Sequence, residues 1–155
     1  MRKILPFIII LVFLSPAVFA GSVNSHLKKG HNFLMKGSAW EAEREYLRVL
    51  EKDPKNGEAY TELGTIEMKR KHYGKAIAYF KKAISSGTVT PETFINLAYC
   101  QRKQGKLQEA AETYQSLIKI HPELAEAHLG LGNIYQLMGK TEKAEQEYSI
   151  YRNQQ

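Results

Sequence analysis

Apolar residues in the segment HLGLGNIYQL, residues 128–137, recur at intervals of three and four. This spacing places them on one face of an α-helix. Similar short strings occur earlier in the chain, where TELG ends at residue 64 and INLA ends at residue 98. A second set of helical segments starts at residues 73, 107 and 141 with YGKAIAYFKKAI, LQEAAETYQSLI and TEKAEQEYSIY. The pattern therefore predicts helices in pairs, joined by short turns.

The helix pairs repeat with a period of 34 residues. Small residues hold this register, followed by alanines and then by aromatic residues, at Gly30, Gly64, Ala98 and Gly132, at Ala42, Ala76, Ala110 and Ala144, and at Tyr46, Phe80, Tyr114 and Tyr148. A fixed period of this length is the sequence signature of a solenoid. The copies cover residues 23–56, 57–90, 91–124 and 125–155.

This pattern resembles the tetratricopeptide repeat (TPR). The resemblance implies an all-α, right-handed α-solenoid of four antiparallel helix pairs over residues 21–155. We expect the small residues to meet the alanines where the two helices of a pair cross closely. We expect the aromatic residues to fill the wedge between one repeat and the next, because each pair needs a neighbour to bury its apolar face.

Glycines are expected at the turn inside each repeat. Gly37, Gly105 and Gly139 fall there, and glycine readily adopts the left-handed backbone that ends a helix. Ser38 and Glu41 then form a predicted capping box at the start of the following helix. The string Gly139-Lys140-Thr141 looks like the end of a phosphate-binding loop, but Ile134 stands where the earlier glycine is required and no strand leads in. We therefore expect no nucleotide binding.

The first twenty residues have the parts of a secretory signal peptide. Arg2 and Lys3 precede an apolar run over residues 4–14, and small residues lead to a predicted cut between Ala20 and Gly21. An uncleaved anchor is the alternative, and we expect membrane contact only in that case. Gly21 stands where a lipoprotein requires cysteine. The sequence predicts an exported bacterial protein of the periplasm that is not a lipoprotein.

Composition gives no indication of catalysis. The single cysteine, Cys100, excludes an internal disulfide and a cysteine-based metal site. No nucleophile, base and stabilising group fall on one predicted face, so we expect neither an enzyme nor a cofactor. The net charge of +6 falls to +4 without Arg2 and Lys3, which is too small to indicate nucleic-acid binding.

The resemblance implies that the first helices line a concave surface that takes an extended peptide or a partner helix. Family positions map the candidate binding residues to Thr65, Lys69, Ile95, Asn96, Tyr99, Arg102, Leu129, Asn133 and Gln136. An asparagine offers both a donor and an acceptor to a peptide backbone. A solvated helix face without a ligand is the alternative. The Lys, Asn and Arg set with which some relatives grip a terminal carboxylate is absent, so we do not expect that type of recognition.

Charges are also distributed unevenly along the first helices. Lys69, Arg102 and Lys103 lie near the turn inside a repeat, whereas Glu58, Glu92 and Glu126 lie at the opposite ends. Favourable interaction with the helix dipole explains this pattern. A basic rim that meets an acidic partner or an anionic membrane surface is the functional alternative.

The last helix raises a second hypothesis. Tyr148, Ile150 and Tyr151 have no following helix in this sequence to pack against, so they form either a modest exposed patch or a surface for self-association. The sequence therefore predicts a non-enzymatic scaffold that binds a protein partner, in the assembly of a cell-envelope complex. The alternative is a structural protein that forms homo-oligomers through its last helix.

Overall fold

The computed structural model describes the backbone of residues 16–155 and the side chains of residues 21–155. It contains eight α-helices over this range: α1 (Pro16–Met35), α2 (Ala39–Lys52), α3 (Gly57–Lys69), α4 (Tyr73–Ser85), α5 (Pro91–Lys103), α6 (Leu107–Ile120), α7 (Ala125–Leu137) and α8 (Thr141–Asn153). Most of the predicted signal peptide, residues 1–15, lies outside the described residues. Helix α1 continues through the predicted cleavage position without interruption.

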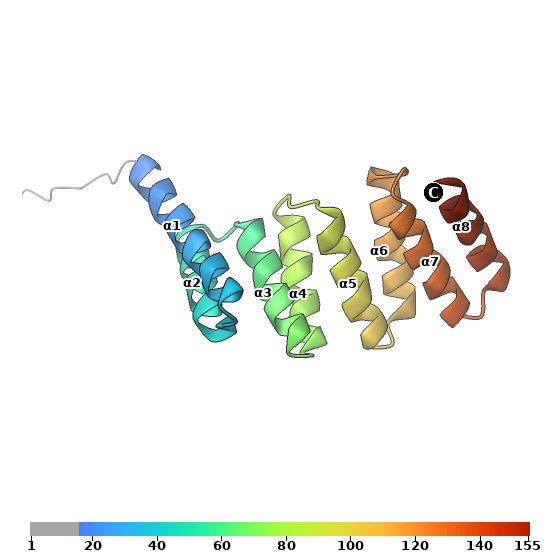
Figure 1. The fold of residues 1–155 in the computed structure, drawn as a ribbon, viewed down its shortest axis with the longest axis horizontal. Helices are drawn as coiled ribbons and strands as arrows, with labels where there is room; N and C mark the ends of the chain where they lie inside the picture. The colour runs from blue at the N-terminus through green and yellow to red at the C-terminus, as the bar shows by residue number, and fades with distance from the viewer. Residues whose placement is uncertain (1–15) are drawn as a thin grey trace, which may run out of the picture.

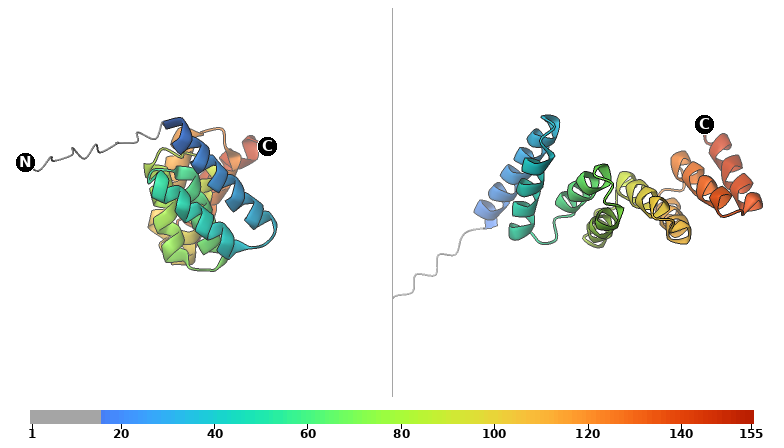
Figure 2. Two further views of the ribbon diagram at one scale, coloured as in Figure 1. Left: turned by 90° about the vertical axis from the view of Figure 1, so that its left-hand side faces the viewer. Right: turned by 90° about the horizontal axis from the view of Figure 1, so that it is seen from below.

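The helices pack as four consecutive antiparallel pairs, α1–α2, α3–α4, α5–α6 and α7–α8 (Figure 1). The pairs follow one another along the long axis of the molecule, with α1 at one end and α8 at the other (Figures 1 and 2). This arrangement confirms the predicted all-α solenoid. Within the described part of the chain, no helix is both long enough and apolar enough to span a membrane.

The turn inside each repeat has a left-handed residue at the same position. Gly37, Gly105 and Gly139 have φ angles of 77°, 74° and 71°, as the sequence predicted. In the second repeat the corresponding residue is Lys71, with a φ of 63°. A side chain with a Cβ atom in this region costs roughly 1 kcal/mol.

The predicted capping box at Ser38 was wrong, because the Ser38 side chain makes no hydrogen bond that caps α2. The residues that precede the second helices share one backbone conformation, with φ between −91° and −82° and ψ between 61° and 70°, at Ser38, His72, Lys106 and Lys140. The left-handed turn before them sets this conformation whatever the side chain. In it, the Ser38 hydroxyl does not reach the free N–H groups of the first turn.

The structure also shows a contact of the small residues that the sequence did not predict. A Cβ atom on Gly30, Gly64 or Gly132 would lie 2.6 to 2.7 Å from the ring of the aromatic residue in its own repeat. Tyr46, Phe80 and Tyr148 therefore lie directly on the first helix of the same pair, rather than only between repeats. Glycine is required because any side chain would displace these rings.

An ion-pair network joins the first two repeats. The Glu67 side chain is 5% exposed, and its carboxylate accepts hydrogen bonds from Arg70 at 2.7 Å and from His72 at 3.0 Å. Arg70 also donates to Glu43 of the first repeat at 2.6 Å. Burial acts to raise the pKa of Glu67, but the hydrogen bonds from Arg70 and His72 outweigh it and hold this pKa below its usual value.

Candidate functional site

The candidate binding residues all lie on one face of the solenoid, formed by α1, α3, α5 and α7, which we call the first-helix face. Lys69, Arg102, Asn133 and Gln136 are exposed. The other five are partly buried and still reach solvent: Thr65, Ile95, Asn96, Tyr99 and Leu129. Seven of the nine line two adjoining pockets, as follows.

The larger hollow, here the α5–α7 pocket, has a volume of about 420 Å³. Helices α5 and α7 form its walls, and Tyr114 enters it from α6. Ten residues line it: Ile95, Ala98, Tyr99, Arg102, Tyr114, Gly130, Asn133, Ile134, Gln136 and Leu137. Five of these were predicted from the sequence. Leu137, which was not, has 56% of its surface exposed and extends the apolar wall.

A second hollow of about 380 Å³, here the α3–α5 pocket, lies on the other side of Tyr99. Its lining residues are Met68, Lys69, Lys71, Tyr73, Ile95, Asn96 and Tyr99. Ile95 and Tyr99 line both pockets, so Tyr99 stands between them. Its ring packs edge-on against Tyr73 with centroids 6.2 Å apart. Arg102 and Lys103 lie 5.4 and 5.5 Å from its centroid, within range of a cation–π interaction.

Two predicted residues, Thr65 and Leu129, line neither pocket. The Thr65 hydroxyl donates a hydrogen bond to the carbonyl of Thr61, one turn earlier in α3, at 3.0 Å. Leu129 lies on α7 and is partly exposed. Both remain on the first-helix face, where a long ligand could still contact them.

Asn133 and Gln136 are oriented by a residue that the sequence had assigned to self-association. The Tyr148 hydroxyl lies 3.0 Å from Asn133 Oδ1 and 2.7 Å from Gln136 Oε1, and it donates to one oxygen at a time. These contacts turn the carbonyl oxygens of both amides toward α8. Their NH₂ groups are therefore the atoms that can bind a peptide carbonyl.

The other two residues predicted for self-association, Ile150 and Tyr151, lie on α8 and still reach solvent. Ile150 is 37% exposed, and residues Arg48, Lys82 and Ser116 stand at its position in the earlier repeats. Helix α6 packs against α7 through Leu107, Ala111 and Ile118. The residues at the corresponding positions of α8 are polar, namely Thr141, Glu145 and Arg152. Arg152 and Glu145 lie 3.9 Å apart as an ion pair.

The position of the α5–α7 pocket follows from a departure in the third repeat. Ala98 stands where the other repeats have glycine. In those repeats a Cβ atom at this position would lie 2.6 to 2.7 Å from the aromatic ring, which is closer than real Cβ contacts allow. The ring of Tyr114 instead lies against Gly130 of the next repeat, where an added Cβ atom would be 2.4 Å from it. Helices α5 and α6 are accordingly the least closely packed of the four pairs.

Sequence reasoning missed Tyr114 and Gly130 as pocket residues, although a signal was present. Gly130 is an additional glycine that does not occupy the small position of its repeat, which is Gly132. It lies in the repeat that follows Ala98, where alanine replaces the glycine found at the small position of the other three repeats. Burial, together with the charge of Glu126, raises the pKa of the Tyr114 hydroxyl, against the opposing effect of Arg102. Tyr114 is therefore neutral and able to donate a hydrogen bond.

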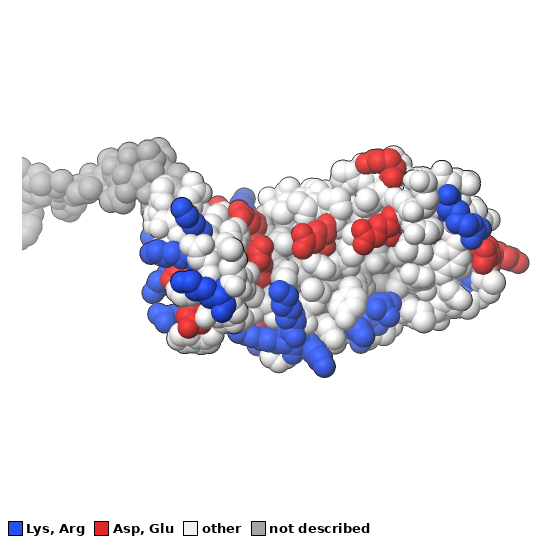
Figure 3. Space-filling model, in the orientation of Figure 1, with Lys and Arg blue, Asp and Glu red and all other residues white. Residues whose placement is uncertain are grey.

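The first-helix face is electrically divided. In the middle of the molecule, over α3 and α5, acidic side chains lie in the upper part of the view and basic side chains in the lower part (Figure 3). Glu58, Glu92 and Glu126 lie in the first turns of α3, α5 and α7. Burial raises the pKa of Glu62 in the acidic half, and nearby Glu92 and Glu58 add to this against the effect of His31. The pockets open in the basic half.

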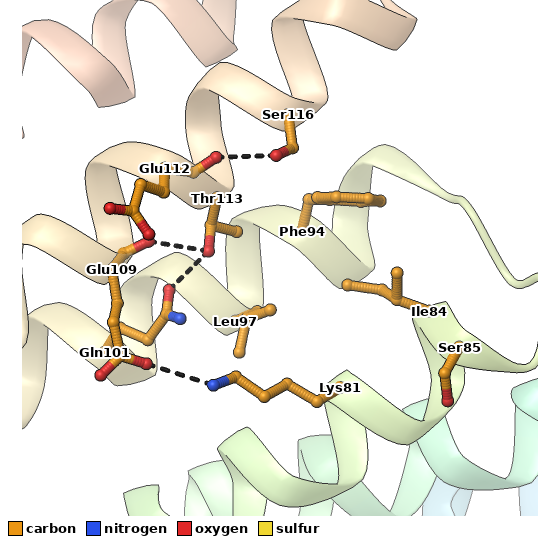
Figure 4. A pocket seen from close by; sticks show the side chains of 10 residues that line it. All are labelled: Lys81, Ile84, Ser85, Phe94, Leu97, Gln101, Glu109, Glu112, Thr113 and Ser116. Atoms are coloured by element: carbon orange, nitrogen blue, oxygen red, sulfur yellow. Dashed lines mark hydrogen bonds and ion pairs between the residues drawn. The ribbon is translucent and has the colours of Figure 1, made fainter.

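A third hollow, the α4–α6 pocket, lies between the second and third repeats on the opposite face of the solenoid and has a volume of about 380 Å³ (Figure 4). Phe94 and Leu97 line it from α5, and the ion pair of Lys81 and Glu109, 3.2 Å apart, spans it. Thr113 is smaller than its counterparts Glu45, Tyr79 and Glu147, which explains the space. Thr113 donates a hydrogen bond to Gln101, which is buried, at 2.8 Å.

Several titratable groups of the described residues form structural contacts. His26 lies 2.7 Å from Glu45 and His128 lies 2.7 Å from Glu147, at matching positions of the first and fourth repeats. Cys100 is fully buried, and burial raises its pKa to about 11. Among the residues described, no three metal-binding side chains converge.

Comparison with known proteins supports the assignment of the repeats. A family model described as "Tetratricopeptide repeat" matches residues 27–88, and one described as "TPR repeat" matches residues 97–139. The chain is similar in structure to MamA, with a TM-score of 0.80 and 22% identity over 90% of this chain and 83% of that one. It is also similar to a tetratricopeptide repeat protein from Parabacteroides merdae, with a TM-score of 0.77 and 26% identity over 84% of this chain and 52% of that one.

Curated relatives are much longer than this chain. Mouse protein O-mannosyl-transferase TMTC1 is 28% identical over 116 residues, which are 72% of this chain and 12% of that protein. Anaphase-promoting complex subunit 6 of Arabidopsis thaliana is 28% identical over 127 residues, 79% of this chain and 23% of that protein. Because the chain spans less than a quarter of either relative, the similarity concerns the repeats and does not extend the transferase activity of the first to this chain.

Proposed function

We propose that this chain of tetratricopeptide repeats is a non-enzymatic adaptor that binds an extended peptide or a partner helix on its first-helix face. The observation that carries the proposal is the convergence of Lys69, Ile95, Asn96, Tyr99, Arg102, Asn133 and Gln136 on two adjoining pockets. Apolar walls beside a few convergent polar groups are typical of binding sites. The free NH₂ groups of Asn133 and Gln136 suit the carbonyl groups of a peptide backbone.

The setting of this adaptor is proposed from the N-terminal sequence. A signal peptide cut after Ala20 would deliver the repeats to the periplasm, where the adaptor would take part in assembling a cell-envelope complex. Intact-mass measurement of the protein from the envelope fraction tests the export step. A mass that begins at Gly21 supports it, and a mass that retains residues 1–20 replaces it with a membrane-anchored adaptor.

The binding face is tested by crosslinked capture from the native envelope fraction with three forms of the protein. The first is unchanged, and the second carries Asn96→Ala, Tyr99→Ala and Asn133→Ala. The third is a matched control on the opposite face, with Lys81→Ala, Glu112→Ala and Ser116→Ala, whose residues line the α4–α6 pocket. Thermal unfolding of all three forms verifies that they fold.

We expect the same partner with the first and third forms and its loss with the second. Loss with the control alone would move binding to the α4–α6 pocket. Recovery of the protein's own chain as the only partner would favour self-association through α8, the alternative hypothesis. In that case the substitution Ile150→Glu should abolish the association, since it places a charge on the exposed apolar residue of α8.

A further inference from the structure

The two pockets of the first-helix face carry charge of one sign. Their charged lining residues are Lys69, Lys71 and Arg102, and no carboxylate lines either pocket. Lys103 follows directly and lies over the Tyr99 ring. None of these four cations is within 4.0 Å of a carboxylate oxygen of the described residues. By contrast, Lys81 in the α4–α6 pocket is neutralised by Glu109.

Lys71 provides a second, independent observation. The other three repeats place glycine at its position in the left-handed turn, whereas Lys71 adopts a φ of 63° there. Glycine would relieve the backbone strain at no steric cost. Residues held in such conformations concentrate at ligand sites, and Lys71 lines the α3–α5 pocket.

Resting on the proposed function, we propose that the groove recognises an acidic peptide segment with bulky apolar side chains. One apolar side chain enters the α5–α7 pocket between Tyr99, Tyr114 and Leu137. Carboxylates on either side of it meet Arg102 and the pair Lys69 and Lys71. Acidic peptide motifs are commonly bound by clusters of such cations, and guanidinium–carboxylate contacts are the strongest of these hydrogen bonds.

A short acidic peptide fits this face better than a long polyanion. Nucleic acid or an anionic membrane surface would cover the whole first-helix face and would meet Glu58, Glu92 and Glu126 in its acidic half. The last turns of α3 and α5 contain basic residues, whereas those of α1 and α7 contain none. Charge complementarity therefore restricts the partner to a segment short enough to stay in the basic half.

The test is a selection from a phage-displayed library of random dodecapeptides on the purified protein. We expect the enriched peptides to combine Asp or Glu with Phe, Leu, Ile, Trp or Met. The affinity of one enriched peptide is then measured by fluorescence anisotropy, at low and high salt. It should weaken as salt rises, because salt screens the interaction between exposed charges.

Three variants localise the binding. Arg102→Glu should weaken the enriched peptide by about tenfold or more, since it reverses a charge at the site. The matched control Lys119→Glu makes the same change of charge on an exposed residue of α6 outside the pockets and should alter affinity less than about twofold. Lys71→Gly should weaken binding severalfold while raising the unfolding midpoint, a combination that loss of folding cannot produce.

The outcomes separate this proposal from the function on which it rests. Enriched peptides that are neutral or basic, yet lose binding with Asn96→Ala, Tyr99→Ala and Asn133→Ala, would overturn the acidic partner and keep the groove. Acidic peptides that bind Arg102→Glu and Lys71→Gly as well as the unchanged protein would also overturn it. Peptides unaffected by the triple substitution, or no enrichment at all, would count against the groove itself.

Discussion

The third repeat and its three neighbours share one fold but differ in how tightly each pair closes. In the first, second and fourth repeats, an aromatic ring lies on a glycine of its own first helix, as Phe80 does on Gly64. In the third repeat, Ala98 prevents this contact, and Tyr114 reaches across to Gly130 instead. The looser pair has a hollow on each of its faces. A repeated scaffold thus acquires pockets where its own packing rule is broken.

The polar contacts of the second and third repeats differ in the same way. Glu67 of the second repeat holds Arg70 and His72 in an ion-pair network that reaches Glu43. Gln101 and Gln104 replace Glu67 and Arg70 in the third repeat, and Gln101 is satisfied by the neutral hydrogen bond from Thr113. The charged link between the second and third repeats is instead the exposed ion pair of Lys81 and Glu109.

The largest expected effect comes from blocking ring packing in a tight repeat. Gly64→Val places side-chain atoms where the buried ring of Phe80 lies, since even a Cβ atom would be 2.7 Å from it. Overpacking of this kind should lower the free energy of unfolding by about 2 to 3 kcal/mol. Urea unfolding followed by circular dichroism measures the change. An unchanged midpoint would contradict the account of glycine at this position.

The next largest effect on stability is expected for Glu67→Gln, which introduces into the second repeat the glutamine that the third repeat has at this position, Gln101. We expect a loss of about 1 to 2 kcal/mol at pH 7, because the hydrogen bonds from Arg70 and His72 lose their charged acceptor. The pKa of Glu67 in the folded protein lies below the ordinary 4.5. Its contribution is therefore complete above pH 4.5 and is lost as the pH falls through the lowered pKa.

Urea titrations of Glu67→Gln and the unchanged protein at pH 7 and pH 3 measure this effect. The difference in unfolding free energy should be smaller at pH 3. A difference of equal size at both values would show that packing, rather than charge, explains the role of Glu67.

A smaller loss is expected for Gly130→Ala, which disturbs the substitute contact of the third repeat. The added methyl group must displace the Tyr114 ring, and we expect a loss of about 1 kcal/mol. Gly74→Ala in α4 is the matched control, since its Cβ atom would meet only the flexible end of Gln104 at 3.1 Å. Thermal unfolding should separate the two variants, and equal midpoints would contradict the role assigned to Gly130.

The smallest effect on stability, together with a loss of binding, is expected for Ala98→Gly. Glycine in a helix costs about 1 kcal/mol relative to alanine, but here it allows Tyr114 to fold onto its own repeat, which offsets part of that cost. The α5–α7 pocket would change shape, and affinity for an acidic peptide should fall about fivefold, which corresponds to about 1 kcal/mol. Isothermal titration calorimetry measures this. Unchanged affinity would show that peptide binding in the α5–α7 pocket does not depend on Ala98.

The sequence predicted the solenoid because its signal was repeated. Gly37, Gly105 and Gly139 recur at one turn, and each copy supported the interpretation of the others. The candidate binding residues followed from the same register, and seven of the nine line pockets. Tyr114 and Gly130 could not be placed in this way, because their contact depends on how one ring moves when Ala98 excludes it. The mutual contacts of Tyr148, Asn133 and Gln136 likewise depend on three-dimensional packing between α7 and α8.

The central claim is that ligand binds in the basic half of the first-helix face, around the third repeat. An NMR titration of ¹⁵N-labelled protein with an enriched acidic peptide tests it most directly. The account predicts chemical-shift changes concentrated on α5 and α7, at Tyr99, Arg102 and Asn133, with little change in α1 and α2. Changes confined to Ile150 and Tyr151 of α8, or to the α4–α6 pocket, would contradict it.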